Sequence, residues 1–290
     1  MDKEKSMESV VVTGISSGIG YGITKVLAAK GLHVFGSVRK ESDKVRLCSE
    51  FGDAVTPLLF DVTDEAEVQA AAQTVRERLA GSTLRGLVNN AGISVTGPLQ
   101  YLPVKDFRRQ LEINLVGPLI VTQAFLPLLG ADHALTGKPG RIVNISSVGG
   151  KIAFPFLGAY NASKFGLEGF SESLRRELMV HGIDVIVVRP GSVATSIWDK
   201  AEAADYMSDY ASTEYAGALA KFVSGMIQGG RKGYPPERIG QTVWKALTTA
   251  RPRTAYEVVP QALQNWILPQ RLPKRTLDRM IAKQLGLSRE

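Results

Sequence analysis

The sequence predicts an α/β fold in which helices cover both faces of one parallel sheet, a doubly wound arrangement. Two observations predict it. Short apolar runs of strand length alternate with longer stretches of helical periodicity along the chain. Several of these runs are followed at once by Gly, Asn or Ser, at the carboxyl ends of strands where such sheets bind ligands. A length of 290 residues suits one domain spanning 1–290.

The elements follow in order from the same alternation. Val10–Val12 is the first apolar run, and similar runs recur at intervals typical of strand–helix units. We expect about seven strands, at 10–12, 33–36, 55–60, 84–89, 141–145, 184–189 and 255–259. We expect helices between them, including 18–30, 64–80, 104–129 and 160–181. The early strand–helix units build one half of the sheet and the later units build the other.

A glycine-rich turn joins the first predicted strand to the first predicted helix. The turn reads Thr13-Gly-Ile-Ser-Ser-Gly-Ile-Gly20, and the helix after it ends near Gly31, a residue that commonly terminates helices. Glycines permit a tight turn and close backbone approach, while the helix N-terminus offers free N–H groups and a positive dipole. A glycine turn by itself is a weak signal, but between a strand and a helix it predicts a dinucleotide pyrophosphate site.

A serine, a tyrosine and a lysine form a second motif. Ser147 precedes Tyr160 by 13 residues, and Lys164 follows Tyr160 by four. Residues at i and i+4 share a helix face, so the ammonium can lie beside the phenol and stabilise its phenolate. The usual tyrosine pKa of about 10 makes a poor base at neutral pH, and a nearby cation lowers that value. The alternative is a chance Tyr/Lys pair on a solvated helix, but the pattern indicates general acid–base chemistry.

The chain resembles the short-chain dehydrogenase/reductase family from about residue 8 to about residue 260. Further family motifs stand here in the family's order: Asp61-Val62, Asn89-Asn90-Ala91-Gly92, Asn114 within Ile-Asn-Leu-Val-Gly, Ser147 in Asn-Ile-Ser-Ser, and Pro190-Gly191-x-x-x-Thr195. The resemblance implies a Rossmann-type doubly wound sheet and an NAD(P)-dependent oxidoreductase, in which the cofactor carries the hydride chemistry.

The resemblance also implies a catalytic tetrad of Asn114, Ser147, Tyr160 and Lys164. Tyr160 would give its proton to a carbonyl oxygen in reduction and act as the base in oxidation. Lys164 would lower the pKa of Tyr160 and bond the nicotinamide ribose hydroxyls, and Ser147 would hydrogen-bond the carbonyl oxygen. Ser147 is preferred to Ser146 because thirteen residues is the family's spacing. Asn114 would hold a water that links Lys164 to solvent, whereas its plainer interpretation is a polar residue that kinks a helix.

The same resemblance implies the residues that surround the cofactor. Asp61 and Val62 would contact the adenine, and Thr195 would lie near the nicotinamide carboxamide, while Asn89 would brace the central strands. The implied cofactor-binding residues are Gly14, Ser16, Ser17, Gly18, Ile19, Gly20, Arg39, Asp61, Val62, Asn90, Ala91, Gly92, Tyr160, Lys164, Pro190, Gly191, Val193 and Thr195.

The end of the second predicted strand indicates which cofactor is preferred. An NAD-specific site usually carries an acid there, which bonds the ribose 2′-OH. Here the run Ser37-Val38-Arg39-Lys40 has two cations and no acid. Arg39 can clamp a 2′-phosphate, with Ser37 or Lys40 assisting, so we expect a preference for NADP(H). In the alternative, Arg39 stacks on the adenine and NAD(H) binds as well.

Composition excludes several other functions. One cysteine and three scattered histidines offer no metal cluster and no intramolecular disulfide. The net charge is +7, but residues from 231 on carry twelve Lys and Arg against four Asp and Glu, so the first 230 residues are nearly neutral. No nucleic-acid motif accompanies this charge. The N-terminus has no apolar signal region, so we expect a cytoplasmic protein.

Two C-terminal segments stand outside the core pattern. Residues 195–235 leave the sixth predicted strand beside the nicotinamide pocket that the resemblance implies, so they should form a helical flap over the substrate. Aromatic and Met residues are interleaved there: Trp198, Tyr206, Met207, Tyr210, Tyr215, Phe222 and Met226. In the alternative, these aromatic residues only anchor a surface helical hairpin. Residues 261–290 form a basic extension in which Leu277, Met280, Ile281 and Leu285 share a helix face. A basic amphipathic helix suits an anionic membrane surface, but the same face could pack on the flap or on a partner subunit.

The predicted function is NADP(H)-dependent interconversion of a bulky apolar ketone or aldehyde and its alcohol. The flap and the stretch 250–256 resemble the hydroxysteroid- and retinol-dehydrogenase-like branch of the family, or carbonyl reductases. The alternatives are a catalytically silent dinucleotide-binding regulatory or scaffold protein, and a nucleotide-sugar epimerase, which shares Tyr-x-x-x-Lys. The family commonly pairs its long helices, so we expect a homodimer or homotetramer.

Overall fold

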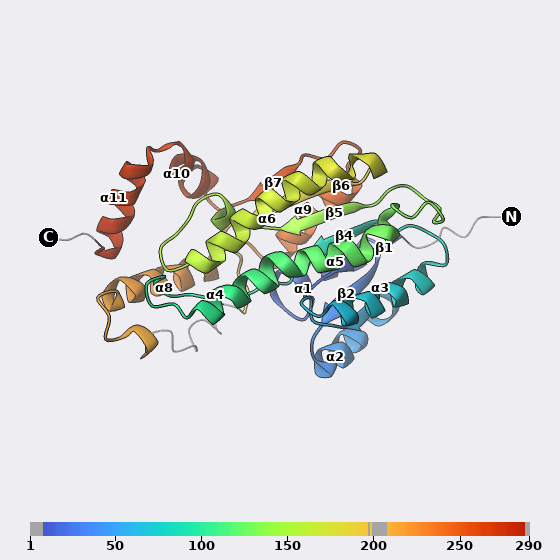
Figure 1. Cartoon of the computed structure of the whole chain (residues 1–290), viewed down its shortest axis with the longest axis horizontal. Coiled ribbons are helices and arrows are strands. Elements are labelled where there is room, and N and C mark those ends of the chain that lie inside the picture. Colours follow the sequence, from blue (N-terminus) through green and yellow to red (C-terminus); the bar gives the residue numbers. More distant parts are fainter. Residues whose placement is uncertain (1–7, 197, 199–207, 288–290) are drawn as a thin grey trace.

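A seven-stranded parallel sheet forms the centre of the computed structural model, which describes residues 8–196, 198 and 208–287 (Figure 1). The strands are β1 (Ser9–Val12), β2 (His33–Val38), β3 (Val55–Leu59), β4 (Gly86–Asn89), β5 (Arg141–Ile145), β6 (Asp184–Pro190) and β7 (Ala255–Val258). Their order across the sheet is β3-β2-β1-β4-β5-β6-β7. The predicted doubly wound fold is confirmed, and each observed strand overlaps a predicted one.

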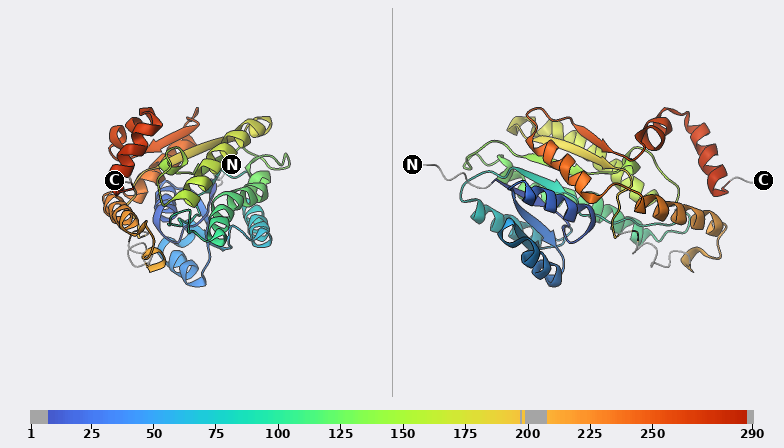
Figure 2. Two further views of the ribbon diagram at one scale, coloured as in Figure 1. Left: turned by 60° about the vertical axis from the view of Figure 1, so that its left-hand side comes forward. Right: turned by 180° about the vertical axis from the view of Figure 1, so that it is seen from behind.

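Helices cover both faces of the sheet because side chains alternate along each strand (Figure 2). Val10 and Val12 point into one buried cluster, and Val11 between them points into the other. The first cluster is closed by α1 (Gly18–Ala29), α2 (Glu41–Phe51) and α9 (Pro236–Thr248). The second is closed mainly by α3 (Glu65–Leu79), α5 (Gly117–Phe125) and the end of α6 (Gly158–Glu177).

The helical run Val104–Leu129 is interrupted where Asn114 lies. It begins as α4 (Val104–Leu111), continues as the π-helical turn Glu112–Val116, and resumes as α5. Among the described residues this run alone has the length and apolar composition of a membrane span. Much of α5 is buried against α3 and β4, so the composition is that of a core helix beside a sheet.

The candidate motifs meet at one edge of the sheet. Parallel strands place their carboxyl ends on the same side, and the segments after β1, β3, β4, β5 and β6 begin with Thr13, Phe60, Asn90, Ser146 and Gly191. This edge of the sheet therefore carries the glycine-rich turn, the segment with Asp61, the asparagine motif, Ser147 and the Pro-Gly motif.

Two helical segments lie together at one end of the molecule (Figures 1 and 2). One is α8 (Ala216–Arg231) within the proposed flap, of which Tyr206 and Met207 lie outside the described residues. The other is the arm formed by α10 (Leu268–Arg271) and α11 (Lys274–Leu285) after β7. Leu285 is buried with Leu219 and Phe156 in a third apolar cluster, so one face of α11 packs on the flap.

Candidate active site

The glycine-rich turn forms an open cradle at the start of α1. Gly14 and Gly18 have φ of 72° and 63°, values that favour glycine, and a Cβ on Gly18 would lie 3.7 Å from the Cβ of Thr195. Ser17 is the N-cap of α1, but its side chain makes no capping hydrogen bond. Free N–H groups and a close backbone approach suit a pyrophosphate, so these residues fit a dinucleotide.

Buried hydrogen bonds hold this turn against β4. The Thr13 Oγ1 accepts hydrogen bonds from the backbone N–H groups of Asn90 and Ala91, both at 2.9 Å. The Asn90 Nδ2 donates to the carbonyl oxygens of Thr13 and Gly14 at 2.8 and 3.2 Å. The Asn90 side chain thus holds the backbone of the glycine-rich turn in place, a role that its sequence motif did not indicate. Asn89 braces β4 and β5 through its Nδ2, which lies 2.9 Å from the Asn144 Oδ1.

The adenine side of the cradle is lined by charged side chains. Arg39 is largely exposed, and its Nη1 lies 3.8 Å from the Asp61 Oδ2. Both residues border a cleft of about 430 Å³ that Arg108 and Arg109 also line. Asp61 is fixed by Thr63, whose N–H and hydroxyl both donate to its Oδ1. A cationic side chain next to a fixed acid fits the phosphorylated ribose and adenine of NADP(H).

Two residues expected on this side have other contacts. Ser37 is buried, and its Oγ accepts a hydrogen bond from the Gly14 N–H at 2.8 Å, so it supports the turn. The Val62 side chain is buried in the core beside Gly117. The assistance of Ser37 to Arg39 and the contact of Val62 with the adenine stay predictions.

The remaining cofactor residues lie where the cradle continues. Ser16 and Ile19 belong to the turn and to the first turn of α1, and the carbonyl oxygen of Ser16 accepts a hydrogen bond from Arg46 at 2.7 Å. Arg46 comes from α2 and no motif indicated it. The other expected residues lie after β4 and at or after the end of β6, namely Ala91, Gly92, Pro190, Gly191, Val193 and Thr195.

Tyr160 and Ser147 lie next to each other. Ser147 follows β5, and its Oγ accepts a hydrogen bond from the Gly149 N–H at 3.0 Å. A Cβ on Gly149 would lie 3.1 Å from the Tyr160 ring and 3.4 Å from the Ser147 Oγ. Burial raises the pKa of Tyr160 above its usual value, and a hydrogen bond with Ser147 opposes that rise. The phenol is therefore protonated at neutral pH, which is the form that donates a proton.

Lys164 is buried one helical turn after Tyr160. Its Nζ donates to the Ile145 carbonyl oxygen at 2.8 Å and lies 5.8 Å from the centre of the Tyr160 ring. Burial lowers the pKa of Lys164 to about 8, against an opposing effect of Glu168. The expected lowering of the Tyr160 pKa by Lys164 is not found, because burial of the phenol dominates. The ammonium has three N–H donors, of which the bond to Ile145 uses one.

Asn114 fastens the segment after β4 to the interrupted helix. Its Oδ1 accepts from the Ile93 N–H at 2.9 Å, and its Nδ2 donates to the Ile93 carbonyl oxygen and to the Ser163 Oγ at 3.0 and 3.2 Å. The π-helical turn fits the plainer interpretation of Asn114 as a polar residue that disturbs the helix. Both amide protons are used on protein partners, whereas the Oδ1 can accept one more hydrogen bond. The water that the resemblance implies stays a prediction.

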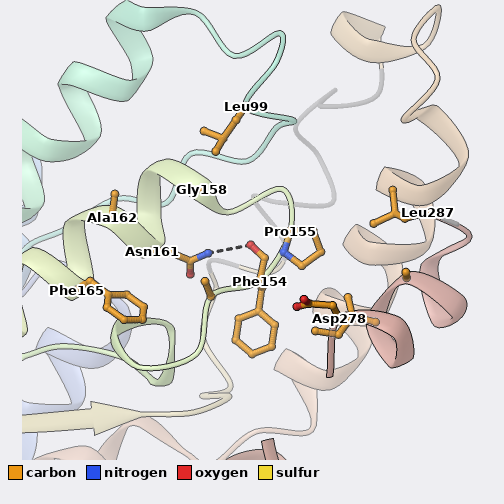
Figure 3. A pocket seen from close by; sticks show the side chains of 12 residues that line it. Leu99, Phe154, Pro155, Gly158, Asn161, Ala162, Phe165, Asp278 and Leu287 are labelled. Carbon is orange, nitrogen blue, oxygen red and sulfur yellow. Dashed lines mark hydrogen bonds between the residues drawn. The ribbon is translucent and has the colours of Figure 1, made fainter. Parts of the chain in front are cut away.

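A groove lies along the face of α6 that carries Asn161, Ala162 and Phe165 (Figure 3). It has a volume of about 550 Å³, and apart from Asn161 and Asp278 its walls are largely apolar side chains of α6, α11 and the segment after Ser147. The Asn161 Nδ2 donates to the Phe154 carbonyl oxygen at 2.8 Å and fixes that segment.

Comparisons with known proteins agree with this geometry. A family profile described as short chain dehydrogenase matches residues 8–205. The NADPH-dependent 3-dehydrocapnine reductase of Ornithobacterium rhinotracheale is 36% identical over 279 residues, covering 96% of this chain and 98% of that protein. Retinol dehydrogenase 7 of Rattus norvegicus is 34% identical, covering 85% and 79%. A structure of the actinorhodin polyketide ketoreductase with NADPH superposes with a TM-score of 0.73 and 31% identity, covering 90% of this chain and 98% of that chain.

Proposed function

Because the chain belongs to the short-chain dehydrogenase/reductase family, we propose that it reduces a bulky, largely apolar ketone or aldehyde with NADPH, and oxidises the alcohol in reverse. It is an NAD(P)-dependent alcohol dehydrogenase/reductase with NADP(H) as cofactor, as NADPH is named for its relative and for the similar ketoreductase structure. The observation that carries the proposal is the placement of Ser147, Tyr160 and Lys164 on the same sheet edge as the glycine cradle.

The residues of the chain have distinct tasks in the reduction. The glycine cradle would hold the cofactor, whose nicotinamide would supply a hydride to the carbonyl carbon. The protonated Tyr160 hydroxyl donates a proton to the carbonyl oxygen, and the Ser147 hydroxyl stabilises the charge that develops there. The free N–H groups of Lys164 would bond the nicotinamide ribose. In oxidation the same proton returns to Tyr160.

An apolar substrate is favoured by the composition of the flap. Phe156 stacks at 6.0 Å from Tyr215 and at 5.7 Å from Phe222, measured between ring centres, and Tyr210 is buried nearby. The relatives named for retinol also act on a large apolar alcohol. We therefore expect ketones with an aromatic or long aliphatic body to be better substrates than small polar ketones.

The experiment is a consumption assay with purified protein. NADPH absorbance is followed with a panel of steroid, retinoid and aryl ketones, and each rate is compared with the same rate for NADH. The proposal expects NADPH consumption with apolar ketones that requires Tyr160. Tight NADPH binding without turnover on the whole panel would instead favour the catalytically silent alternative.

Assembly and membrane contact complete the proposal. Phe165 on α6 and Leu119 on α5 expose 45% and 40% of their surface, and these helices are the ones expected to pair in a homodimer or homotetramer. On the C-terminal arm Leu263, Leu268 and Met280 are exposed among Arg and Lys residues. Such a surface suits a peripheral contact with an anionic membrane, while Ile281 and Leu285 pack on the flap.

A further inference from the structure

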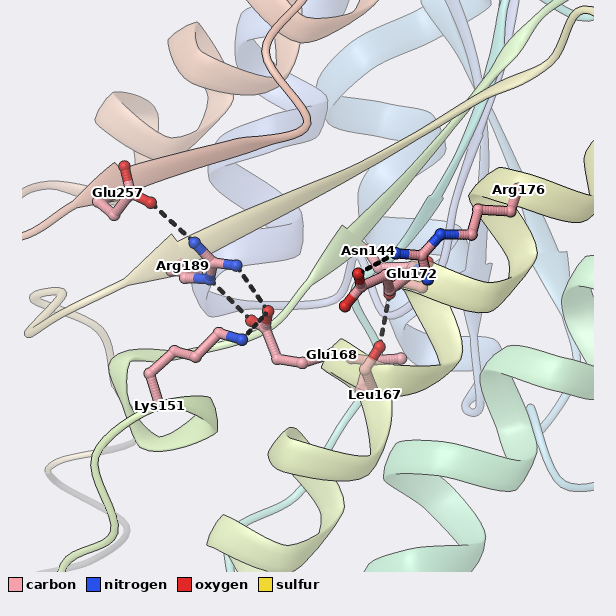
Figure 4. Close-up of polar contacts among 9 residues, drawn as sticks. Asn144, Lys151, Leu167, Glu168, Glu172, Arg176, Arg189 and Glu257 are labelled. Carbon is pink, nitrogen blue, oxygen red and sulfur yellow. Dashed lines mark hydrogen bonds and ion pairs between the residues drawn. The ribbon is translucent and has the colours of Figure 1, made fainter. Parts of the chain in front are cut away.

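A buried carboxylate lies one helical turn beyond Lys164. Glu168 is four residues after Lys164 on α6, and the two residues are only 7% and 6% exposed. The Arg189 guanidinium binds both Glu168 oxygens, with Nε at 2.9 Å and Nη2 at 2.7 Å (Figure 4). The third contact of Arg189 is Glu257 on β7, 2.8 Å from its Nη1. This bidentate geometry fixes the carboxylate in one orientation.

The same carboxylate also reaches the segment that carries Ser147. The Lys151 Nζ lies 3.4 Å from the Glu168 Oε2, and Lys151 directly follows the short turn Val148–Gly150. A Cβ on Gly150 would lie 3.1 Å from the Lys164 carbonyl oxygen and 3.2 Å from the Glu168 Cγ, so this turn rests directly on α6. Glu168 therefore connects the turn of α6 that carries Lys164 to the segment that carries Ser147.

Several charged groups surround Glu168. Lys164 lies one turn earlier on the same face of α6, while Arg189 from β6 and Lys151 from the turn after Ser147 form ion pairs with the carboxylate, and Glu257 lies beyond Arg189. Burial raises the pKa of Glu168, but the hydrogen bonds from Arg189 and Ser146 and the nearby cations outweigh it and lower that pKa. Buried ion pairs contribute little net stability compared with apolar residues, so a role in the site is the better explanation.

We propose that Glu168 is a positioning residue for the reaction: clamped by Arg189, its carboxylate is the fixed counter-charge of the Lys164 ammonium and the anchor of the Ser147 segment. The inference rests on the proposed function, because it assigns to Lys164 and Ser147 the tasks given above. Without the carboxylate, burial alone acts on the ammonium and favours its neutral form.

The test is Glu168→Gln in the full chain. The pH dependence of kcat/KM for NADPH-dependent ketone reduction is measured together with the pH dependence of NADPH affinity, read from cofactor fluorescence. Both profiles of the wild-type protein should fall above a pH of about 8, where Lys164 loses its charge. In Glu168→Gln this fall should move to lower pH by about one unit, the smallest effect typical of an opposite charge at close range.

Glu257→Gln is the matched control. It removes the other carboxylate that binds Arg189 and should leave both profiles in place, since the carboxylate of Glu168 remains beside Lys164. Unmoved profiles in Glu168→Gln, or equal shifts in the two variants, would overturn the inference. If Glu168 had only a structural role, Glu168→Gln would lower the midpoint of unfolding but would not move the pH at which kcat/KM and NADPH affinity fall.

A second variant covers the case in which Glu168→Gln does not fold. Arg189→Lys keeps the positive charge but cannot form two parallel bonds to the carboxylate, so the fall should move in the same direction by a smaller amount. Profiles identical to wild type would then count against the inference. Failure of the proposed function is distinguishable, because it would abolish turnover in wild type while the NADPH affinity profile still reports on Lys164.

Discussion

The carbonyl oxygen of Gly14 lies where a side chain on Gly20 would begin. A Cβ on Gly20 would overlap this oxygen and the Asn90 Nδ2, which is the group that ties the turn to the segment after β4. The first and third glycines of the motif thus act as a pair, one supplying the left-handed turn and the other the space for its carbonyl.

Gly20→Ala should therefore damage the cradle. Forcing an atom into this space costs about 1–3 kcal/mol, and we expect NADPH affinity to fall by about tenfold or more. Gly225→Ala is the control, because Gly225 lies inside α8 with no atom within 4 Å of its Cβ position. Fluorescence titration with NADPH measures both variants, and equal affinities would show that the turn adapts.

Tyr160→Phe should remove the proton donor and little else. We expect turnover to fall by at least ~10²-fold, the lower range for a positioned acid or base, with NADPH affinity almost unchanged. Ser147→Ala should also lower turnover, since the hydroxyl bonds the same oxygen. Stopped assays with excess enzyme measure the residual rate, and a rate within a few-fold of wild type would remove Tyr160 from the mechanism.

Burial of Lys164 should appear in the pH dependence of stability. Its pKa is about 8 in the folded protein and about 10.5 in an exposed chain, so the folded state binds fewer protons between these values and its stability rises with pH there. Below pH 8 the buried ammonium costs about 3 kcal/mol. Lys164→Met should therefore have a higher free energy of unfolding than wild type at neutral pH, and this difference should shrink by pH 10. Urea unfolding at both pH values measures it, and a gain independent of pH would contradict the assignment.

Arg39→Asp should reverse cofactor preference toward NADH. The variant removes a charge-assisted bond to the 2′-phosphate and adds repulsion beside Asp61. We expect kcat/KM for NADPH to fall by at least tenfold relative to NADH, and Lys40→Asp, which changes the next residue, to have a smaller effect. Unchanged kinetic constants for both cofactors would show that Arg39 does not meet the phosphate.

Charge reversal on the C-terminal arm tests the membrane contact. Arg275→Glu with Arg279→Glu should abolish sedimentation with anionic liposomes at low salt, because each basic residue near such a surface contributes about 1 kcal/mol. Lys30→Glu with Lys138→Glu, exposed cations elsewhere on the protein, is the control. If the wild-type protein stays in the supernatant, packing on the flap is the only role left for α11.

Local sequence patterns predicted the sheet and the ends of its strands well. Each strand is an apolar run flanked by turn residues, and the motifs follow the carboxyl ends because the parallel sheet places them there. Tyr160 and Lys164 could be paired from their spacing alone, since a helix brings i and i+4 together.

Contacts between distant segments were not predictable from the sequence. The Oγ of Ser37 accepts a hydrogen bond from the N–H of Gly14, which lies 23 residues earlier, and no local pattern indicates this contact. Arg189 precedes the Pro-Gly motif and Glu168 follows Lys164 by one turn, but nothing local indicates that the two meet. The phenol's raised pKa likewise follows from burial by the whole fold.

Phe156 joins the flap to the segment that follows Ser147. Its φ is 64°, a conformation that costs a bulky residue about 1–3 kcal/mol, and its ring is buried against Phe222 of α8. Burial of the ring against the flap is what retains this backbone in the segment between Ser147 and Tyr160. Loss of that packing should let the backbone relax, and amide hydrogen exchange at Gly149 would report the change.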